Sequence, residues 1–103
     1  MSTIETKTQD TGGIQLLQFY ADWCQPCNMM MPIIESIKQK GTDWLTVKQI
    51  DVDRASELSN QLHIRSIPTF VVLRNDQEIW RYTGMLAEHS FIEILESLRE
   101  NSY

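Results

Sequence analysis

Apolar positions along the chain first separate into short runs, which predict β-strands. Runs of strand length stand at 14–21, 45–52 and 69–73, and the last is a continuous apolar run, as in a central strand covered on both faces. Residues 78–83 follow the turn-forming segment Arg74–Gln77 and alternate as a half-buried strand does. The pattern therefore predicts four strands, the last two of which are joined as a hairpin.

A second pattern has apolar residues three and four positions apart, which predicts amphipathic helices. The first helix passes through Met30 and stops near Gly41, a short one follows Asp53, and the last lies near the C-terminus. The positions that carry the spacing are Met30, Ile33, Ile34 and Ile37, then Ala55, Leu58 and Leu62, then Phe91, Ile94, Leu95 and Leu98. Pro32 should kink the first helix, because proline offers no N–H and crowds the preceding turn.

The elements follow the order strand, helix, strand, helix, strand, strand, helix. A strand–helix–strand unit implies parallel pairing, and the late hairpin adds antiparallel strands. The expected fold class is therefore α/β, with three α/β/α layers around a central mixed sheet. A chain of 103 residues is expected to form one domain. We place this domain at residues 14–103, after a polar arm at residues 1–13 that has room for a short edge strand at Thr3–Thr8.

Composition and charge exclude several classes of function. The net charge of −5 argues against nucleic-acid binding, which needs a basic footprint. No stretch approaches the roughly 20 apolar residues that a membrane span requires. The first 13 residues lack the apolar run of a signal peptide, so secretion is not indicated. Two cysteines are too few for a disulfide-dense secreted scaffold.

Both cysteines of the chain lie in the segment YADWCQPC, between the first strand and the first helix. Cys24 stands at the helix start, and Pro26 has a position suited to the first turn. Unpaired backbone N–H groups and the positive end of the helix favour an anion there, so a Cys24 thiolate is favoured. Cys27, about one turn further along, is placed to attack the mixed disulfide that Cys24 forms. The spacing therefore supplies an attacking thiol, a resolving thiol and a small reversible ring.

Three other interpretations of the cysteine pair stay open at this point. A structural disulfide across two intervening residues removes little entropy from the unfolded chain, so it would be a weak staple. A structural zinc site needs four ligands, and the candidates besides the cysteines, His63 and His89, are far apart and not spaced as a ligand pair. Two buried, inert thiols are the third interpretation, although the start of a helix suits inert thiols poorly.

Several motifs together resemble the thioredoxin family, from about Ile14 to the C-terminus. FYADWCQPC resembles the family's active site, Pro32 matches its helix-kinking proline, IRSIPTFVVL resembles the segment with its cis-proline, and TGMLA at 83–87 matches its glycine loop. The resemblance implies a thioredoxin fold with a shortened N-terminal strand and helix, and a thiol–disulfide oxidoreductase that reduces protein disulfides. Cys24 would be the nucleophile and Cys27 the resolving thiol, with no metal and no cofactor beyond their redox-active disulfide.

The resemblance also implies four substrate-binding residues beside the cysteines. Trp23 would offer protein substrates a flat apolar contact. Pro68 would follow a cis bond and leave the backbone of Ile67 free to pair with an extended substrate segment, as in strand addition. Gly84 would let that segment come close.

Four positions near the cysteines depart from the family's pattern. Gln25–Pro26 stands where the family usually has Gly-Pro, and Asn28 where it often has lysine. Gln18 replaces a buried aspartate that is thought to help deprotonate the resolving thiol, and Gln49 replaces the lysine that pairs with it. We therefore expect Gln25, Pro26, Gln18 and Gln49 to tune the redox chemistry.

The replacements at positions 18 and 49 are mutually consistent. Losing only one partner of a buried ion pair would strand a charge, whereas two amides avoid that penalty and can hydrogen-bond to each other. No carboxylate then remains at position 18 to accept the proton of Cys27, and Asp22, Glu35 and water are weaker acceptors. We expect Cys27 to resolve mixed disulfides more slowly than in a relative that keeps the aspartate.

The resemblance implies protein disulfides as substrates and a separate reductase, of the thioredoxin reductase kind, as the recycling partner. We expect a monomer that acts in the cytoplasm. Two alternatives stay open. The same cysteines would serve an oxidase or isomerase in a more oxidising compartment, because reduction potential and partner supply decide the direction. A binding module that uses the surface around Trp23 and Pro68 is a different class, and the cysteines weigh against it, since binding alone needs neither.

Overall fold

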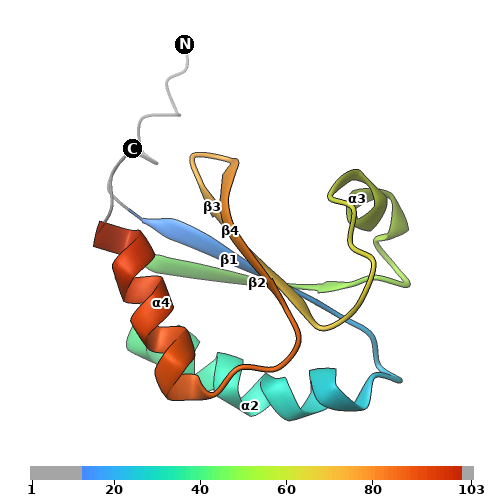
Figure 1. The fold of residues 1–103 in the computed structure, drawn as a ribbon, viewed down its shortest axis with the longest axis horizontal. Helices are drawn as coiled ribbons and strands as arrows, with labels where there is room; N and C mark the ends of the chain where they lie inside the picture. Colours follow the sequence, from blue (N-terminus) through green and yellow to red (C-terminus); the bar gives the residue numbers. More distant parts are fainter. Residues whose placement is uncertain (1–12, 101–103) are drawn as a thin grey trace.

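A computed structural model describes residues 13–100 of the chain (Figure 1). The elements are β1 (Ile14–Tyr20), α2 (Gln25–Lys40), β2 (Leu45–Asp51), α3 (Ser56–Gln61), β3 (Thr69–Arg74), β4 (Gln77–Thr83) and α4 (Glu88–Glu100). Their order is the one predicted from the hydrophobic pattern. Residues 1–12 of the polar arm, and with them the proposed edge strand at Thr3–Thr8, lie outside the described residues.

The four described strands form one mixed sheet in the order β2-β1-β3-β4. β1 pairs in parallel with β2 and antiparallel with β3, and β4 pairs antiparallel with β3. Parallel pairing is therefore confirmed for β1–α2–β2, but it is wrong for the unit that contains α3. With six residues, α3 is only about 9 Å long and cannot carry the chain back along a strand. β3 therefore starts near the end of β2 and runs in the opposite direction.

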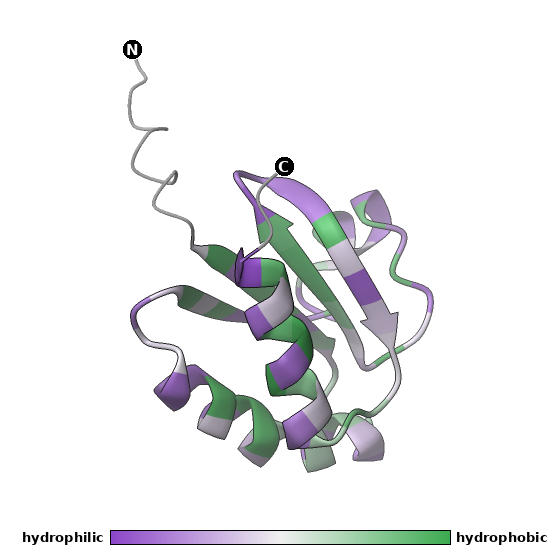
Figure 2. Ribbon diagram, turned by 60° about the vertical axis from the view of Figure 1, so that its left-hand side comes forward, coloured by the Kyte–Doolittle hydropathy of each residue, from purple (hydrophilic) through white to green (hydrophobic). Residues whose placement is uncertain are grey.

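Helices cover both faces of the sheet, α2 and α4 on one and α3 on the other (Figure 1). Figure 2 shows hydrophobic and hydrophilic residues in bands along α2 and α4, as expected of helices that lay one side on a sheet. The larger buried cluster consists of Ile14, Leu16, Met30, Ile34, Ile37, Leu45, Phe70, Val72, Phe91 and Leu95. The smaller cluster, on the opposite face, consists of Leu17, Phe19 and Val71. The predicted three-layer α/β/α class is confirmed.

β3 is the central strand that its apolar run predicts. Phe70 and Val72 pack into the larger cluster, while Val71 packs into the smaller one, and none of the three is exposed to solvent. Successive side chains of a strand point to opposite faces. A strand with no polar position between residues 70 and 72 therefore needs a layer on each side.

The predicted alternation of β4 is wrong, because a β-bulge interrupts its pairing with β3. Val72 pairs with Trp80 and Leu73 with Glu78, which leaves Ile79 as the extra residue. Ile79 and Trp80 consequently both pack against the larger cluster. A bulge adds one residue to one strand and shifts every side chain beyond it to the other face, so hydropathy no longer alternates along β4.

A polar cluster joins the two helices that share the larger core. The Glu88 carboxylate, at the start of α4, accepts hydrogen bonds from Lys40 Nζ at 2.8 Å and Ser36 Oγ at 2.6 Å, both on α2. These donors, Lys40 first, hold the pKa of Glu88 below its ordinary value. We call Glu88, Lys40 and Ser36 the α2–α4 clasp. It fixes the C-terminal half of α2 against the first turn of α4.

Substitution of Phe91 by alanine tests the larger core. The Phe91 ring meets Phe70 edge-on, with centroids 4.9 Å apart, and lies 6.0 Å from the Trp80 ring. Phe91→Ala should lower the free energy of unfolding by about 3–5 kcal/mol, through lost transfer energy and the remaining cavity. Urea unfolding measures this loss, with Glu96→Ala on the exposed side of α4 as the control. Similar losses in the two variants would contradict this packing.

Candidate active site

The two cysteines lie where β1 passes into α2. Cys24 is the N-cap of the helix, with extended backbone angles (φ −90°, ψ 108°). Its N–H donates to the carbonyl of Ala21 at 3.1 Å, and its own carbonyl accepts the first helical hydrogen bond, from the N–H of Asn28, at 3.1 Å. Pro26 lies in the first turn, where a missing N–H costs nothing. The predicted places of Cys24 and Pro26 are confirmed.

The sulfur of Cys24 lies at the positive, N-terminal end of α2, and no acidic side chain in the first turn of the helix opposes that positive charge. The amide N–H of Cys27 donates to Cys24 Sγ at 3.2 Å. The first turn of α2 has no acidic residue, whereas Lys38 and Lys40 lie in the last turn, where cations are favoured. This arrangement stabilises a negative charge on the Cys24 sulfur.

Cys24 and Cys27 form a disulfide with their Cα atoms 5.2 Å apart. Cys24 keeps 5% of its surface exposed, whereas Cys27 has none. Ala21 packs beside them, with Val52 and Ile67 at the edge of the cluster. Cys24 is therefore the sulfur that an incoming molecule reaches first, and Cys27 is covered by apolar groups.

Trp23 precedes the disulfide in the chain and keeps 71% of its surface exposed. A hydrogen bond holds its ring in place. Its indole N–H donates to Asp53 Oδ2 at 2.9 Å, and the N–H of Asp53 donates to Asp51 Oδ1 at 2.9 Å. The sequence interpretation missed Asp53. The signal was present, because β1 and β2 are parallel and the residues that follow them meet at one edge of the sheet, where Tyr20 pairs with Asp51.

The segment that precedes β3 reaches the same site. The Ile67–Pro68 bond is cis, as the resemblance implied, and Ile67 packs against the cysteine cluster. The Pro68 carbonyl accepts a hydrogen bond from the N–H of Gly84 at 2.9 Å. Gly84 has φ +117°, a conformation that residues with a Cβ rarely adopt. The structure thus brings together the cysteines, Ile67, Pro68 and Gly84 from three separate parts of the chain.

Gln18 and Gln49 form a neutral pair that approaches α2 at Met31. They are partners across β1 and β2, and Gln49 Nε2 donates to Gln18 Oε1 at 3.0 Å, which confirms the predicted amide–amide hydrogen bond. Both amides also approach the thioether of Met31, at 3.3 Å from Gln49 and 3.8 Å from Gln18. Met31 lies one helical turn after Cys27, and its part in this cluster was not foreseen from the sequence.

The remaining polar residues near the cysteines face solvent. Gln25 and Asn28 are exposed, and Asn28 Nδ2 donates to the Asp22 carbonyl at 3.4 Å. The Glu35 carboxylate accepts from Gln39 on the exposed side of α2. Asp22 and Glu35 were the carboxylates considered as proton acceptors for the resolving thiol, yet both are exposed while that thiol is covered.

Comparison with known proteins places this geometry in a family. A family model described as Thioredoxin matches residues 2–97. The chain belongs to the thioredoxin family. It is 37% identical to a thioredoxin of Mycoplasmoides gallisepticum over 79% of this chain and 80% of that protein. It is 34% identical to the chloroplastic Thioredoxin Y of Oryza sativa subsp. japonica over 82% of this chain, which spans about half (51%) of the rice protein.

A solved structure agrees with both the fold and the family. The germline-specific thioredoxin Deadhead of Drosophila melanogaster superposes with a TM-score of 0.79 and 33% identity, over 91% of this chain and 88% of that one. With its Cys24–Cys27 pair, this thioredoxin-family chain is a thiol–disulfide oxidoreductase of the protein-disulfide reductase class. Between residues 13 and 100, no helix is long and apolar enough to cross a membrane, and no three His, Cys, Asp or Glu side chains gather as a metal site.

Unequal burial of the two amides predicts unequal effects of replacing them. Gln18 is fully buried, whereas Gln49 reaches solvent. Gln49→Leu leaves the buried Gln18 oxygen without its donor and should lower the free energy of unfolding by about 1–2 kcal/mol. Gln18→Leu should cost less than half as much, because the freed Gln49 amide can turn to water. Urea unfolding of both variants measures the difference, and equal losses would contradict the asymmetry.

Proposed function

We propose that this chain reduces disulfides of other proteins by two successive exchanges, with Cys24 as the nucleophile and Cys27 as the resolving thiol. The hydrogen bond from the Cys27 amide to Cys24 Sγ, at 3.2 Å, carries this assignment of roles. It supports Cys24 as the sulfur whose anion is stabilised once the disulfide is reduced, and the exposed fractions of the two cysteines support the same sulfur as the accessible one.

The reaction starts from the dithiol form of the pair. The Cys24 thiolate attacks one sulfur of a substrate disulfide, a mixed disulfide forms, and the other substrate sulfur leaves as a thiolate that takes up a proton. Cys27 then loses its proton and attacks the Cys24 sulfur, which releases the second substrate thiol. Two electrons pass to the substrate, and the protein is left with the Cys24–Cys27 disulfide seen in the structure.

The proposed substrate-binding surface surrounds the Cys24 sulfur. Trp23 offers an exposed ring whose orientation is held by the hydrogen bond to Asp53. Ile67 precedes the buried Pro68 and offers its backbone to an extended segment of the substrate. The positive φ of Gly84 and the absence of a side chain there leave room for that segment. These contacts favour an unfolded or extended stretch of protein around the disulfide.

The resolving step is proposed to proceed without an internal carboxylate. Cys27 lies among apolar groups, and the Gln18 amide, which accepts from Gln49, approaches α2 at Met31, one helical turn after Cys27. An amide cannot take a proton from a thiol at neutral pH. Water or the departing substrate thiolate must accept it, so the mixed disulfide should be longer lived than in a protein with a buried carboxylate at position 18.

The direction and setting of the reaction belong to the same proposal. A reductase needs its dithiol restored, and we propose a separate enzyme of the thioredoxin reductase kind as the electron donor. Such a couple operates in a reducing compartment, so we propose the cytoplasm. Gln25 and Pro26 lie inside the ring that the disulfide closes and are proposed to tune its reduction potential. A potential in the range of oxidases would contradict this direction.

Serine substitutions test the two cysteine roles. Cys24→Ser should abolish the dithiothreitol-coupled reduction of insulin, because no nucleophile remains. Cys27→Ser should also lose turnover but should accumulate a mixed disulfide with the substrate, which mass spectrometry of the intact adduct detects. The double variant separates catalysis from binding, since a protein that only binds its partner would keep its full function. Adducts on residue 27 of the Cys24→Ser variant, together with none on residue 24 of the Cys27→Ser variant, would reverse the assignment.

An acidic substitution at position 18 tests the resolving step. Gln18→Asp places a carboxylate in the site and should shorten the lifetime of the mixed disulfide by about tenfold or more near neutral pH, as general bases do. Rapid-mixing kinetics with a fluorescent disulfide peptide measure that lifetime. Gln18→Asn is the matched control, because it has the same length without the charge. Equal lifetimes in the wild type and Gln18→Asp would refute the idea.

A further inference from the structure

The loop over residues 62–68 connects α3 with β3 and ends at the proposed substrate-binding backbone. It starts where α3 ends, and Leu62 is the C-cap of that helix. The chain then reverses through His63, whose φ is +57°, and the N–H of Ile64 donates back to the Ser59 carbonyl at 2.9 Å. Carbonyls at the end of a helix lack partners within it, and α3 has no basic residue in its last turn to supply one.

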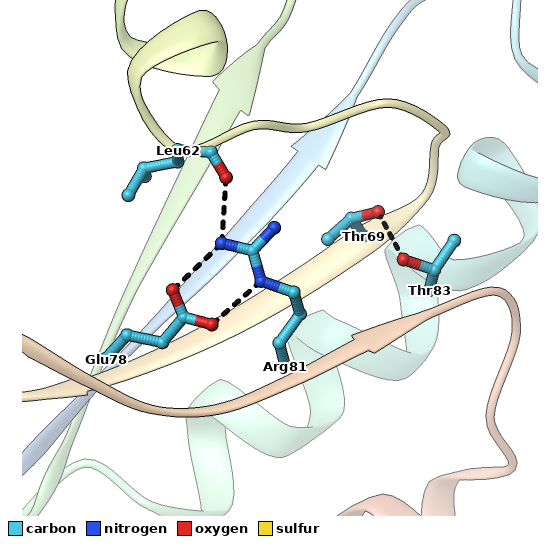
Figure 3. Close-up of polar contacts among 5 residues, drawn as sticks. All are labelled: Leu62, Thr69, Glu78, Arg81 and Thr83. Carbon is cyan, nitrogen blue, oxygen red and sulfur yellow. Dashed lines mark hydrogen bonds and ion pairs between the residues drawn. The ribbon is translucent and has the colours of Figure 1, made fainter.

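The partner for the Leu62 carbonyl comes from β4. Arg81 Nη2 donates to the Leu62 oxygen at 2.8 Å (Figure 3). The same guanidinium donates two hydrogen bonds to the Glu78 carboxylate, from Nε to Oε2 at 2.8 Å and from Nη2 to Oε1 at 2.8 Å. The fork holds the guanidinium in one orientation, which directs the second N–H of Nη2 at the Leu62 carbonyl. We call Arg81, Glu78 and the Leu62 carbonyl the loop clamp.

The bulge in β4 is what allows the loop clamp to form. Side chains three positions apart in a regular strand point to opposite faces of the sheet. Because Ile79 is the extra residue, Glu78 pairs with Leu73 and Arg81 pairs with Val71, two residues of β3 whose side chains lie on the α3 side. Both charged groups therefore reach the same face. The pKa of Glu78 is lowered, and that of Arg81 raised, mainly by their mutual hydrogen bonds.

The other end of the loop is fastened by Thr69, the first residue of β3, which in turn contacts Thr83 of β4. Thr69 Oγ1 donates to the Ser66 carbonyl at 2.6 Å and lies 2.9 Å from Thr83 Oγ1 (Figure 3). Thr83 and Arg81 are two positions apart, so they share a face of β4. β4 thus holds the loop directly at Leu62, through Arg81, and indirectly at Ser66, through Thr83 and Thr69. Ile67, which packs against the cysteine cluster, lies between Leu62 and Thr69.

We propose that the Arg81–Glu78 pair is a positioning device for the reduction of protein disulfides. By holding the Leu62 carbonyl, it keeps the Ile67 backbone in the place where an extended substrate segment pairs with it. This rests on the proposed function. Arg81 does not touch the reacting sulfurs, so its loss should weaken the binding of protein substrates and leave the chemistry at Cys24 unchanged.

Kinetics with a large and a small substrate test the proposal. Arg81→Ala should raise KM for insulin by about threefold to tenfold, the equivalent of one hydrogen bond. It should leave kcat for insulin, the rate with hydroxyethyl disulfide and the alkylation rate of Cys24 by iodoacetamide unchanged. Amide hydrogen exchange at Ile64 and Ile67 should accelerate by a similar factor. Arg81→Lys, which keeps the charge without the fork, should fall between wild type and Arg81→Ala.

A milder variant and a control complete the experiment. Glu78→Gln disturbs the packing least, because glutamine has nearly the same size and shape as glutamate. It should show the same changes to a smaller degree, because the guanidinium keeps one oxygen acceptor and loses the charge of its partner. Lys40→Ala breaks another ion pair of the same length, 2.8 Å, between α2 and α4, and should leave KM unchanged. An unaltered KM in both clamp variants, or a parallel fall in the rate with hydroxyethyl disulfide, overturns the proposal.

Hydrogen exchange separates this proposal from the proposed function. If wild-type protein reduces neither insulin nor hydroxyethyl disulfide, the proposed function fails. The loop clamp is then decided by exchange at Ile64 and Ile67 alone, where faster exchange in Arg81→Ala supports it and unchanged exchange overturns it.

Discussion

The hydrogen bond from the Cys27 amide to the Cys24 sulfur joins the fold of this chain to its chemistry, because it exists only where a helix begins at a cysteine. β1 ends at Tyr20, and a short turn brings Cys24 to the N-cap of α2. The other end of α2 is held by the α2–α4 clasp, so the direction of the helix is fixed against the sheet. The Cys24 sulfur lies at the N-terminal end of this helix, where the aligned peptide dipoles favour a negative charge.

The buried side chain of Gln18 has its hydrogen-bonding partner without any charged group. Gln18 and Gln49 satisfy each other and share the Met31 thioether, and among the described residues no buried side-chain nitrogen or oxygen lacks a partner. A neutral pair avoids the desolvation cost of a buried ion pair. The same choice leaves no carboxylate at position 18, so the two side chains that satisfy this region are also those proposed to slow the resolving step.

Much of the architecture could be predicted from hydropathy, because each element keeps its own period. The four strands and three helices, the N-cap position of Cys24 and the Gln18–Gln49 contact all follow from patterns in single segments or from the resemblance. Features that depend on distance between elements could not be predicted in this way. The antiparallel course of β3 follows from the shortness of α3. Asp53 becomes the partner of Trp23 only once β1 and β2 lie in parallel register.

The contact between Glu78 and Arg81 is a further feature that the sequence pattern does not predict. Residues three apart are neighbours on a helix but point to opposite faces of a regular strand. The sequence alone therefore does not predict a contact between Glu78 and Arg81. The bulge adds one residue between them, so their side chains point to the same face, as those of residues two apart do in an uninterrupted strand. The pairing therefore depends on the extra residue in β4 as well as on the two charged side chains. Deleting the extra residue Ile79 would leave the two charges two positions apart on the same face, whereas a further insertion between them would place them on opposite faces.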